Sequence, residues 1–115
     1  MNTASHDVTQ QVFRSLADPI RRDIVTLLAV KPCSVHEVAS QFTVSRTAVV
    51  KHLKVLESSG LVVTETSGRE RINHLDPQGL KAASDWLADF NRFWETKLQS
   101  LKMAVEDNYR DESDA

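Results

Sequence analysis

The stretch that decides the fold runs from Val44 to Leu61 and reads VSRTAVVKHLKVLESSGL. Ser45 belongs to the residue types that cap helix N-termini, and Val44 before it and Val49 after it have the spacing of a hydrophobic staple. One face of the resulting helix carries the apolar residues Val49, Val50, Leu53 and Leu56. Gly60 is suited to the position just past a helix end. The stretch therefore predicts one amphipathic helix that ends before Gly60.

The opposite face of this helix is polar and basic, and it carries Thr47, Ala48, Lys51, Lys54, Val55 and Ser58. The whole chain has 115 residues and a net charge of −2, which by itself argues against a nucleic-acid partner. Five of the 16 acidic residues but only one of the 14 basic residues lie in residues 104–115. The remaining residues 1–103 therefore carry a net charge of +2, and a basic binding surface is compatible with the composition.

Three further helices are predicted upstream. Apolar residues spaced by four indicate a first helix that stops at Ala17. Asp18 followed by Pro19 is a strong helix start, and the second helix ends near residues 31–32. Ser34 and Glu37 have capping-box spacing, which predicts a short third helix reaching Phe42. Together with the helix that follows Ser45, this gives a helix, a tight turn and a helix.

A β-hairpin is predicted downstream, with strands over 61–66 and 69–75 around a turn at Ser67 and Gly68. Asp76 is placed to cap a last helix opened by Pro77. Its apolar residues step by three and four from Leu80 to about residue 105. Residues 1–7 and 108–115 are predicted to be disordered tails of a single domain that spans residues 1–115.

The predicted fold class is mainly α with a small antiparallel β-hairpin, in the order helix, helix, helix, helix, strand, strand, helix. This is the order of a winged helix-turn-helix, whose second helix of the pair enters the major groove of DNA. The predicted DNA-binding residues are Ser45, Arg46, Thr47, Ala48, Lys51, His52 and Lys54 in the helix, and Arg69 and Arg71 in the hairpin. Phosphate contact and plain solvation remain equal alternatives for Lys54. Glu70 can divert one neighbouring Arg into a cross-strand ion pair, and Arg21 and Arg22 are predicted to be structural or solvated.

Several function classes are not supported by the sequence. No run approaches the roughly 20 apolar residues that cross a bilayer, and the first residues lack the regions of a signal peptide, so we expect a cytoplasmic protein. Cys33 is the single cysteine, and together with His36 it supplies only two metal ligands. We expect no metal and no cofactor. No clustered nucleophile and base and no Gly-rich phosphate loop are present, so we expect no enzyme activity.

The last predicted helix carries a wide apolar stripe, too large to leave exposed on a small domain. We expect a homodimer in which this helix and the first one form the interface, with the predicted residues Val12, Phe13, Leu16, Trp86, Leu87, Phe90, Phe93, Trp94 and Leu98. An intramolecular core is the alternative. A small-molecule effector between these helices, with Trp86 and Trp94 as walls, also stays open.

Three segments of the chain resemble the ArsR-type bacterial transcriptional repressors. They are VFRSLADPIRRDIVTLL over residues 12–28, the stretch from Val44 to Leu61 quoted above, and the hairpin over 62–75. Their Leu-Ala-Asp-Pro and Ser-x-x-x-Val-x-Lys-His-Leu patterns are specific in combination. The resemblance implies a dimeric, sequence-specific DNA-binding regulator that represses its own or a neighbouring operon from a palindromic operator, with the terminal helices forming the dimer interface.

The chain departs from the metal-sensing members of that family. Their Cys-Val-Cys-type motif is replaced by CSVHE over residues 33–37, which has no second thiol. Other members place Asp and His ligands on the last helix, whereas no histidine occurs between Gly79 and Asp107. The resemblance is therefore to the non-metal members. A winged-helix module that binds only proteins and a metal-responsive repressor with other ligands remain the alternatives.

Overall fold

The computed structural model describes residues 3–114, with side chains described for residues 7–110. The chain divides into two compact units, Met1–Ala83 and Ser84–Ala115. The first unit contains all the buried residues of the hydrophobic core. In the second unit, every described side chain is exposed.

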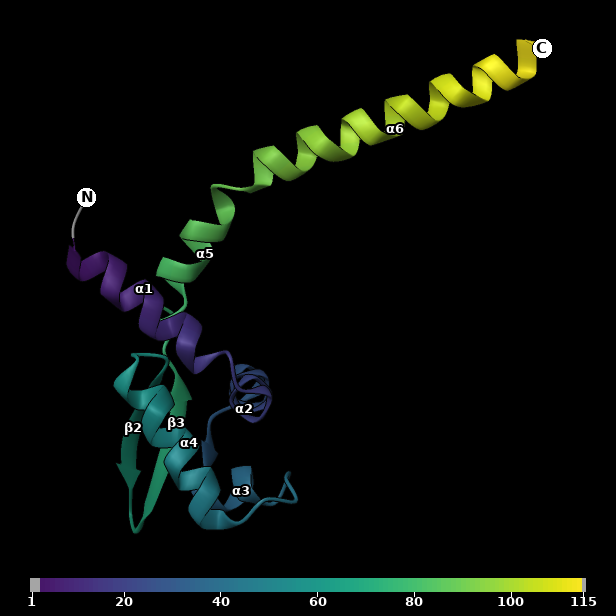
Figure 1. Ribbon diagram of the computed structural model, residues 1–115. Helices are drawn as coiled ribbons and strands as arrows, with labels where there is room; N and C mark the ends of the chain where they lie inside the picture. Colours follow the sequence, from purple (N-terminus) through teal and green to yellow (C-terminus); the bar gives the residue numbers. More distant parts are fainter. Residues whose placement is uncertain (1–2, 115) are drawn as a thin grey trace. The chain divides into compact units, whose positions relative to one another are not determined.

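The first unit begins with four helices, α1 (Thr3–Ser15), α2 (Pro19–Val30), α3 (Val35–Ala39) and α4 (Arg46–Ser58) (Figure 1). The predicted caps are confirmed. Asp18 accepts from the backbone amides of Ile20 (2.8 Å) and Arg21 (3.2 Å). Ser34 and Glu37 form the predicted capping box. Helix α1 already includes residues 3–7, which the sequence assigned to a disordered tail, whereas α3 ends at Ala39, three residues earlier than predicted.

Helix α4 has the predicted boundaries at both ends. The Ser45 hydroxyl accepts from the Ala48 amide at 3.1 Å. At the other end, the amide of Gly60 donates to Glu57 and that of Leu61 donates to Leu56. These two bonds form a Schellman motif, which requires the left-handed backbone that Gly60 adopts at φ 83°.

The sheet has three strands, β1 (Cys33–Ser34), β2 (Val62–Ser67) and β3 (Glu70–Leu75), in the order β1-β3-β2. The hairpin β2–β3 was predicted, but β1 was not. β1 pairs antiparallel with β3, with Cys33 opposite Asn73. The buried Asn73 amide donates to the Cys33 carbonyl at 3.2 Å and so joins the two strands by a side chain as well. A two-residue strand has no periodicity that the sequence could reveal.

The core lies between the helices and the sheet. Its fully buried members include Val12, Ile24, Val38, Val49, Leu56, Leu61 and Val62. Val12 requires a correction, because the sequence placed it in a dimer interface. Its side chain has no exposed surface and packs in the core of its own chain. Leu16 is half-buried against the same core, whereas Phe13 is exposed.

The last predicted helix starts later than expected and is divided in two, α5 (Lys81–Ala88) and α6 (Asn91–Asp114). Residues 77–80 form a turn, in which the amide of Gln78 donates to the Asp76 carboxylate at 2.9 Å. The division falls after Ala88, and the amide of Phe90 donates to Leu87 in a tighter turn. Residues 80–114 contain neither Gly nor Pro, so no strong sequence signal marks the break.

The second unit is helical and carries the predicted aromatic stripe. The ring centroids of Trp86 and Phe90 lie 4.7 Å apart, and those of Phe93 and Trp94 lie 6.0 Å apart. The predicted interface residues Trp86, Leu87, Phe90, Phe93, Trp94 and Leu98 are all exposed in the single chain. Residues 108–114 are part of α6 rather than a disordered tail. Among the described residues, no helix is both long and apolar enough to cross a membrane.

Candidate DNA interface

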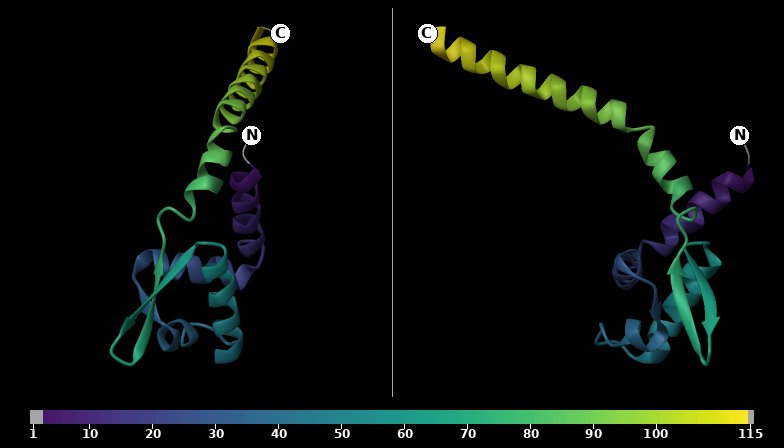
Figure 2. Two further views of the ribbon diagram at one scale, coloured as in Figure 1. Left: turned by 90° about the vertical axis from the view of Figure 1, so that its left-hand side faces the viewer. Right: turned by 180° about the vertical axis from the view of Figure 1, so that it is seen from behind.

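The N-terminal end of α4 and the tip of the hairpin lie at the same end of the first unit (Figures 1 and 2). The helix presents its polar face outward there. Ser45, Arg46, Thr47, Lys51 and Lys54 are exposed, whereas Ala48 and His52 are half-buried. The buried face of the same helix consists of Val49, Leu53 and Leu56. The tertiary structure thus leaves most of the predicted helix contacts accessible because the apolar stripe faces the core.

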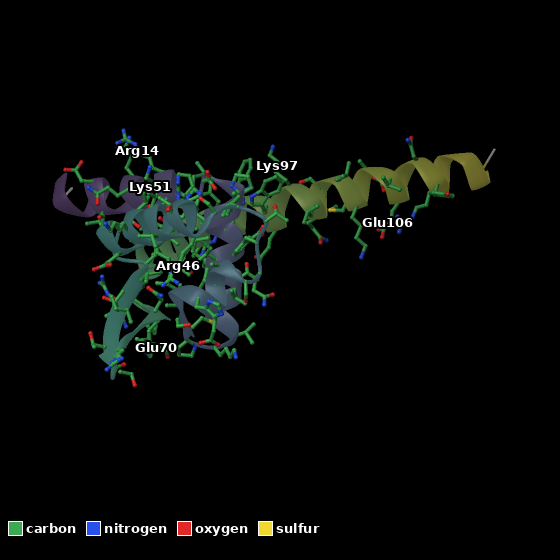
Figure 3. All side chains as sticks on the ribbon, turned by 90° about the horizontal axis from the view of Figure 1, so that it is seen from below. Arg14, Arg46, Lys51, Glu70, Lys97 and Glu106 are labelled. Atoms are coloured by element: carbon green, nitrogen blue, oxygen red, sulfur yellow. The ribbon has the colours of Figure 1, made fainter. Side chains whose placement is uncertain are left out.

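The positive charges on this face are not neutralised internally. Within the described part of the chain, no carboxylate forms an ion pair with Arg46, Lys51 or Lys54. Figure 3 looks onto this end of the unit and shows Arg46 between Lys51 on the helix and Glu70 near the hairpin tip. Unpaired arginine and lysine side chains on one helix face are the groups that contact phosphate oxygens and guanine edges in DNA.

The hairpin places its two arginines differently. Register pairs Ser67 with Glu70, so Gly68 and Arg69 form a two-residue turn, and Gly68 has φ 63° as such a turn requires. Arg69 therefore lies at the tip rather than in the strand where the sequence placed it. Arg71 lies in β3, and its guanidinium donates to the Thr64 hydroxyl at 3.2 Å. The described residues show no ion pair between Glu70 and either arginine, so the diversion considered from the sequence does not occur.

Helix α4 and the hairpin border one common hollow of about 260 Å³. It is lined by Ser34, Val35 and His36 from the start of α3, by Arg46, and by Arg69, Glu70 and Arg71. Lys54 does not line this hollow. It borders a second hollow of about 410 Å³ that Arg14 and Arg21 also line, and a smaller one of about 40 Å³ that it shares with Thr64 and Arg71 of the hairpin. The structure thus gathers three of the predicted DNA-binding residues around one hollow and leaves Lys54 outside it.

Arg21 and Arg22 have the structural role that the sequence favoured. The Arg21 guanidinium donates to the carbonyl oxygens of Ser15 (2.6 Å) and Arg14 (3.2 Å), the last residues of α1. Arg22 donates to Leu16 at 2.7 Å. The Arg14 carbonyl also accepts from the Ala17 amide at 3.2 Å. The carbonyls of Ser15 and Leu16 end or follow the helix and have no partner within it, so the two arginines satisfy acceptors that would otherwise need water.

Arg21 also contacts α4, the helix predicted to enter the major groove of DNA, and the sequence did not indicate this contact. Its Nη1 atom lies 3.4 Å from Nδ1 of His52 and 3.9 Å from the Asp18 carboxylate. His52 was predicted to contact DNA, but its Nδ1 side faces Arg21. The contact joins the start of α2 to the middle of α4 across 31 residues of sequence. Sequence spacing carries no signal for a pair so far apart.

Backbone hydrogen bonds and burial shift the pKa values of Asp18, Glu37 and Cys33. The hydrogen bond that the backbone amide of Arg21 donates to the Asp18 carboxylate lowers the pKa of that carboxyl below its usual value. The amide of Ser34 lowers the pKa of Glu37 in the same way. Burial raises the pKa of the Cys33 thiol, which keeps it protonated. A buried, protonated thiol is a poor nucleophile and a poor metal ligand.

Side-chain clusters that could hold a metal were also considered. Across the described side chains, no group of three or more His, Cys, Asp and Glu residues is placed to bind one ion. His36, the partner considered for Cys33, lines the hollow beside Arg46 and is exposed, whereas Cys33 is buried in the core.

Comparisons with known proteins agree with this geometry. Residues 18–64 match the model of the family described as bacterial regulatory protein, arsR family. The chain is 40% identical to the HTH-type transcriptional regulator Rv2034 of Mycobacterium tuberculosis over 84% of this chain and 87% of that protein. It is 38% identical to the HTH-type transcriptional repressor SmtB of the same species, over 60% of this chain and 51% of that protein.

A solved structure supports the same relationship. It is the homodimeric winged helix-turn-helix DNA-binding domain of Mb0332 from Mycobacterium bovis, described as a possible ArsR-family transcriptional regulator. It superposes with a TM-score of 0.63 and 25% identity, over 76% of this chain and 84% of that chain. The chain belongs to the arsR family of bacterial regulatory proteins, and it is a DNA-binding transcriptional regulator with a winged helix-turn-helix fold.

Proposed function

We propose that this protein is a homodimeric repressor that binds a palindromic operator in its own or a neighbouring promoter. Each protomer inserts the N-terminal part of α4 into a major groove and lays the hairpin on the adjacent backbone or minor groove. The observation that carries the proposal is the set of exposed cations on α4 and the hairpin at one end of the first unit, none of them in an ion pair within the described residues.

The contacts divide by position along α4. Ser45, Arg46 and Thr47 lie in the first turn, where the recognition helix is closest to base edges. Lys51 lies further along on the exposed face and reaches phosphates. Lys54 lies near the C-terminal end of α4, furthest along the helix from its first turn, and contributes least. The half-buried His52 acts mainly through Arg21 and not by reading bases.

Dimerisation is proposed to use the apolar face of α5 and α6 together with exposed Phe13 of α1. The single chain exposes Trp94, Leu98 and Leu101 by about three-fifths of their surface, at 61%, 61% and 63%. Exposed apolar stripes of this length mark interaction surfaces, and a second copy is the partner indicated by the homodimeric relative. A two-fold dimer matches half-sites roughly 34 Å apart along DNA.

The DNA proposal is tested by fluorescence anisotropy with the duplex immediately upstream of the protein's own gene and with a scrambled duplex, at two salt concentrations. We expect a preference of roughly 1,000-fold or more for the native duplex, and a loss of affinity as salt rises. Arg46→Ala and Lys51→Ala should each weaken binding and flatten the dependence of log K on log salt by up to about 0.9 for each lost phosphate contact.

Arg92→Ala is the matched control, because Arg92 is an exposed arginine of α6 outside the proposed interface. It removes the same charge and should leave the affinity within about twofold. Equal weak binding to both duplexes would exclude sequence-specific recognition of this promoter. Unchanged affinity in both the Arg46 and Lys51 variants, with intact folds, would exclude α4 as the recognition helix.

The dimer is tested by sedimentation velocity with Trp94→Asp and Leu98→Asp. A charge placed in an apolar interface must be desolvated without a partner, so both variants should sediment as monomers and lose most of their operator affinity. Val30→Asp is the matched control, since Val30 is 81% exposed on α2 and outside the proposed interface. Dimeric Trp94 and Leu98 variants would overturn the assignment of the interface to α6.

In this proposal the protein acts in the cytoplasm. It requires neither a catalytic step nor a cofactor, because its binding to the promoter excludes RNA polymerase. An effector that separates the dimer would relieve repression. The aromatic side chains of Trp86 and Trp94 are the proposed walls for such a small molecule, which a quench of tryptophan fluorescence during ligand screening would reveal.

A further inference from the structure

The hollow between α3, α4 and the hairpin gathers basic groups from three elements that are far apart in sequence. His36 comes from α3, Arg46 from the first residue of α4, and Arg69 and Arg71 from the hairpin. This convergence differs from separate solvated charges, because three cations around one hollow repel each other unless an anion lies between them.

Neighbouring acidic groups do not fill the hollow. Glu70 is the one carboxylate among its lining residues, so three arginines border the hollow against one carboxylate. Glu37, next to His36 in sequence, accepts from the Ser34 amide at 3.1 Å and pairs with Lys31 at 3.4 Å. Neither carboxylate forms an ion pair with Arg46, Arg69 or Arg71 in the part of the chain that is described.

Arg71 is held in place before any ligand arrives. Its Nη2 atom donates to the Thr64 hydroxyl, which lies diagonally across the hairpin on the same face. The guanidinium has five N–H donors, so this bond leaves the others for a ligand. The side chain therefore loses less conformational entropy on binding than a free arginine would, and its planar fork suits two oxygens of one phosphate.

We propose that the hollow seats a single backbone phosphate of the DNA, held jointly by Arg46, Arg71 and His36. The assignment rests on the proposed function and adds to it a contact residue, His36, that belongs to neither the recognition helix nor the hairpin. The hollow of about 260 Å³ has room for a phosphodiester group with some bound water, since one water occupies roughly 30 Å³. An imidazole carries an N–H group that can donate a hydrogen bond to a phosphate oxygen.

Such a phosphate fixes how the protein sits on the duplex. One anion contacts α3, α4 and the hairpin at once, so it locks the angle between the recognition helix and the hairpin. Phosphate contacts of this kind set register and orientation without reading sequence. Loss of His36 should therefore weaken binding to the native and the scrambled duplex by a similar factor.

The test is a scan of the promoter duplex in which one phosphate at a time is replaced by an uncharged methylphosphonate. Anisotropy titrations compare the wild type with His36→Ala, His36→Gln, Arg71→Ala and the control Arg92→Ala. On the unmodified duplex we expect Arg71→Ala to weaken binding roughly tenfold or more, as loss of a charge-assisted contact does. His36→Ala should weaken it several-fold, and His36→Gln, which keeps an N–H donor, should recover part of the affinity.

One methylphosphonate position in each half-site should weaken the wild type by a comparable factor. On that modified duplex the His36 and Arg71 substitutions should weaken binding further by less than about twofold, because the phosphate that these side chains hold is already uncharged. Full additivity at every position, or different positions for His36 and Arg71, would overturn the shared phosphate. A wild-type protein without preference for the promoter duplex would instead refute the proposed function.

The variants are chosen to keep the fold. His36 and Arg71 are exposed, and neither belongs to the hydrophobic core. Circular dichroism and thermal midpoints of the four variants should match those of the wild type. Arg71→Ala can lower the thermal midpoint through the lost Thr64 bond. In that case Arg71→Gln and the His36 variants still test the shared phosphate, because each additivity test compares two duplexes with the same protein variant.

Discussion

Arg21→Ala is the substitution whose effect on folding the structure defines best. The guanidinium donates to the Ser15 carbonyl at 2.6 Å, in a partly buried place, and to the exposed Arg14 carbonyl at 3.2 Å. A hydrogen bond from a charged donor contributes about 1.5–3 kcal/mol where it is shielded from water and little where it is exposed. Removal also takes the guanidinium partner from the Ser15 carbonyl, whereas the Arg14 carbonyl still accepts from the Ala17 amide.

These contributions give an expected loss of about 2–3 kcal/mol, most of it from the Ser15 bond. For a chain of this size such a loss lowers the melting temperature by roughly 10 °C. Chemical denaturation followed by far-ultraviolet circular dichroism measures the first number and thermal unfolding the second. Protein concentration must be equal for all variants, since dimerisation stabilises the folded state by mass action.

Two companion variants test how much the Arg21 guanidinium contributes to stability. Arg21→Lys keeps the charge but loses the planar fork, and it should fall between Arg21→Ala and the wild type. Arg22→Ala removes the neighbouring guanidinium, whose bonds to Leu16 and Ala17 are exposed, and should cost less than half as much. If Arg21→Ala lies within about 0.5 kcal/mol of the wild type, as ordinary surface substitutions do, the capping role assigned to Arg21 is wrong.

Three further predictions concern stability. Gly79→Ala should lower the free energy of unfolding in urea by about 1–3 kcal/mol, because the added Cβ would overlap the Gly60 carbonyl oxygen. At Gly60 no atom lies near an added Cβ, so Gly60→Ala should lower it by about 1–2 kcal/mol through the positive φ alone. An unchanged stability in Gly79→Ala would contradict the close packing. Ser45→Ala should cost about 1 kcal/mol through the lost Ala48 bond, and Ser45→Asp, which can accept the same bond, should restore it. Asp18 has a lowered pKa in the folded protein, so its contribution is complete above its unfolded pKa and is lost as pH falls through the lower folded value. Urea midpoints measured from pH 6 to pH 3 should therefore fall less steeply in Asp18→Asn than in the wild type, and parallel curves would refute this linkage.

The local structure was predictable where the decisive partners lie within about four residues of each other. Asp18 and Pro19 start α2, Ser45 starts α4, and Gly60 ends it, each through hydrogen bonds or backbone angles set by the residue itself. The hairpin followed from alternation and from Gly68. The sequence also located most of the exposed polar face of α4, because the apolar residues at helical spacing leave one face for solvent.

Errors arose where the sequence has no local signal. Val12 lies in an apolar stripe that fits a dimer interface or a core equally well, and only packing within the chain shows that it is fully buried. The division between α5 and α6 involves no Gly or Pro, and the late start of α5 follows a turn in which Gly79 packs against Gly60. The third strand, β1, pairs with β3 across about 40 residues of sequence, and the Asn73 side chain bonds to the Cys33 carbonyl at the same place.

The sequence by itself determined the order of the elements, the caps of α2, α3 and α4 and the basic face of the recognition helix, because these depend on neighbours along the chain. The tertiary structure decided that Arg46, Arg71 and His36 surround one hollow and that Arg21 reaches His52. Those groups come from elements separated by many residues. Their positions are fixed by the burial of a common core, a property of the whole folded unit that no short stretch of sequence contains.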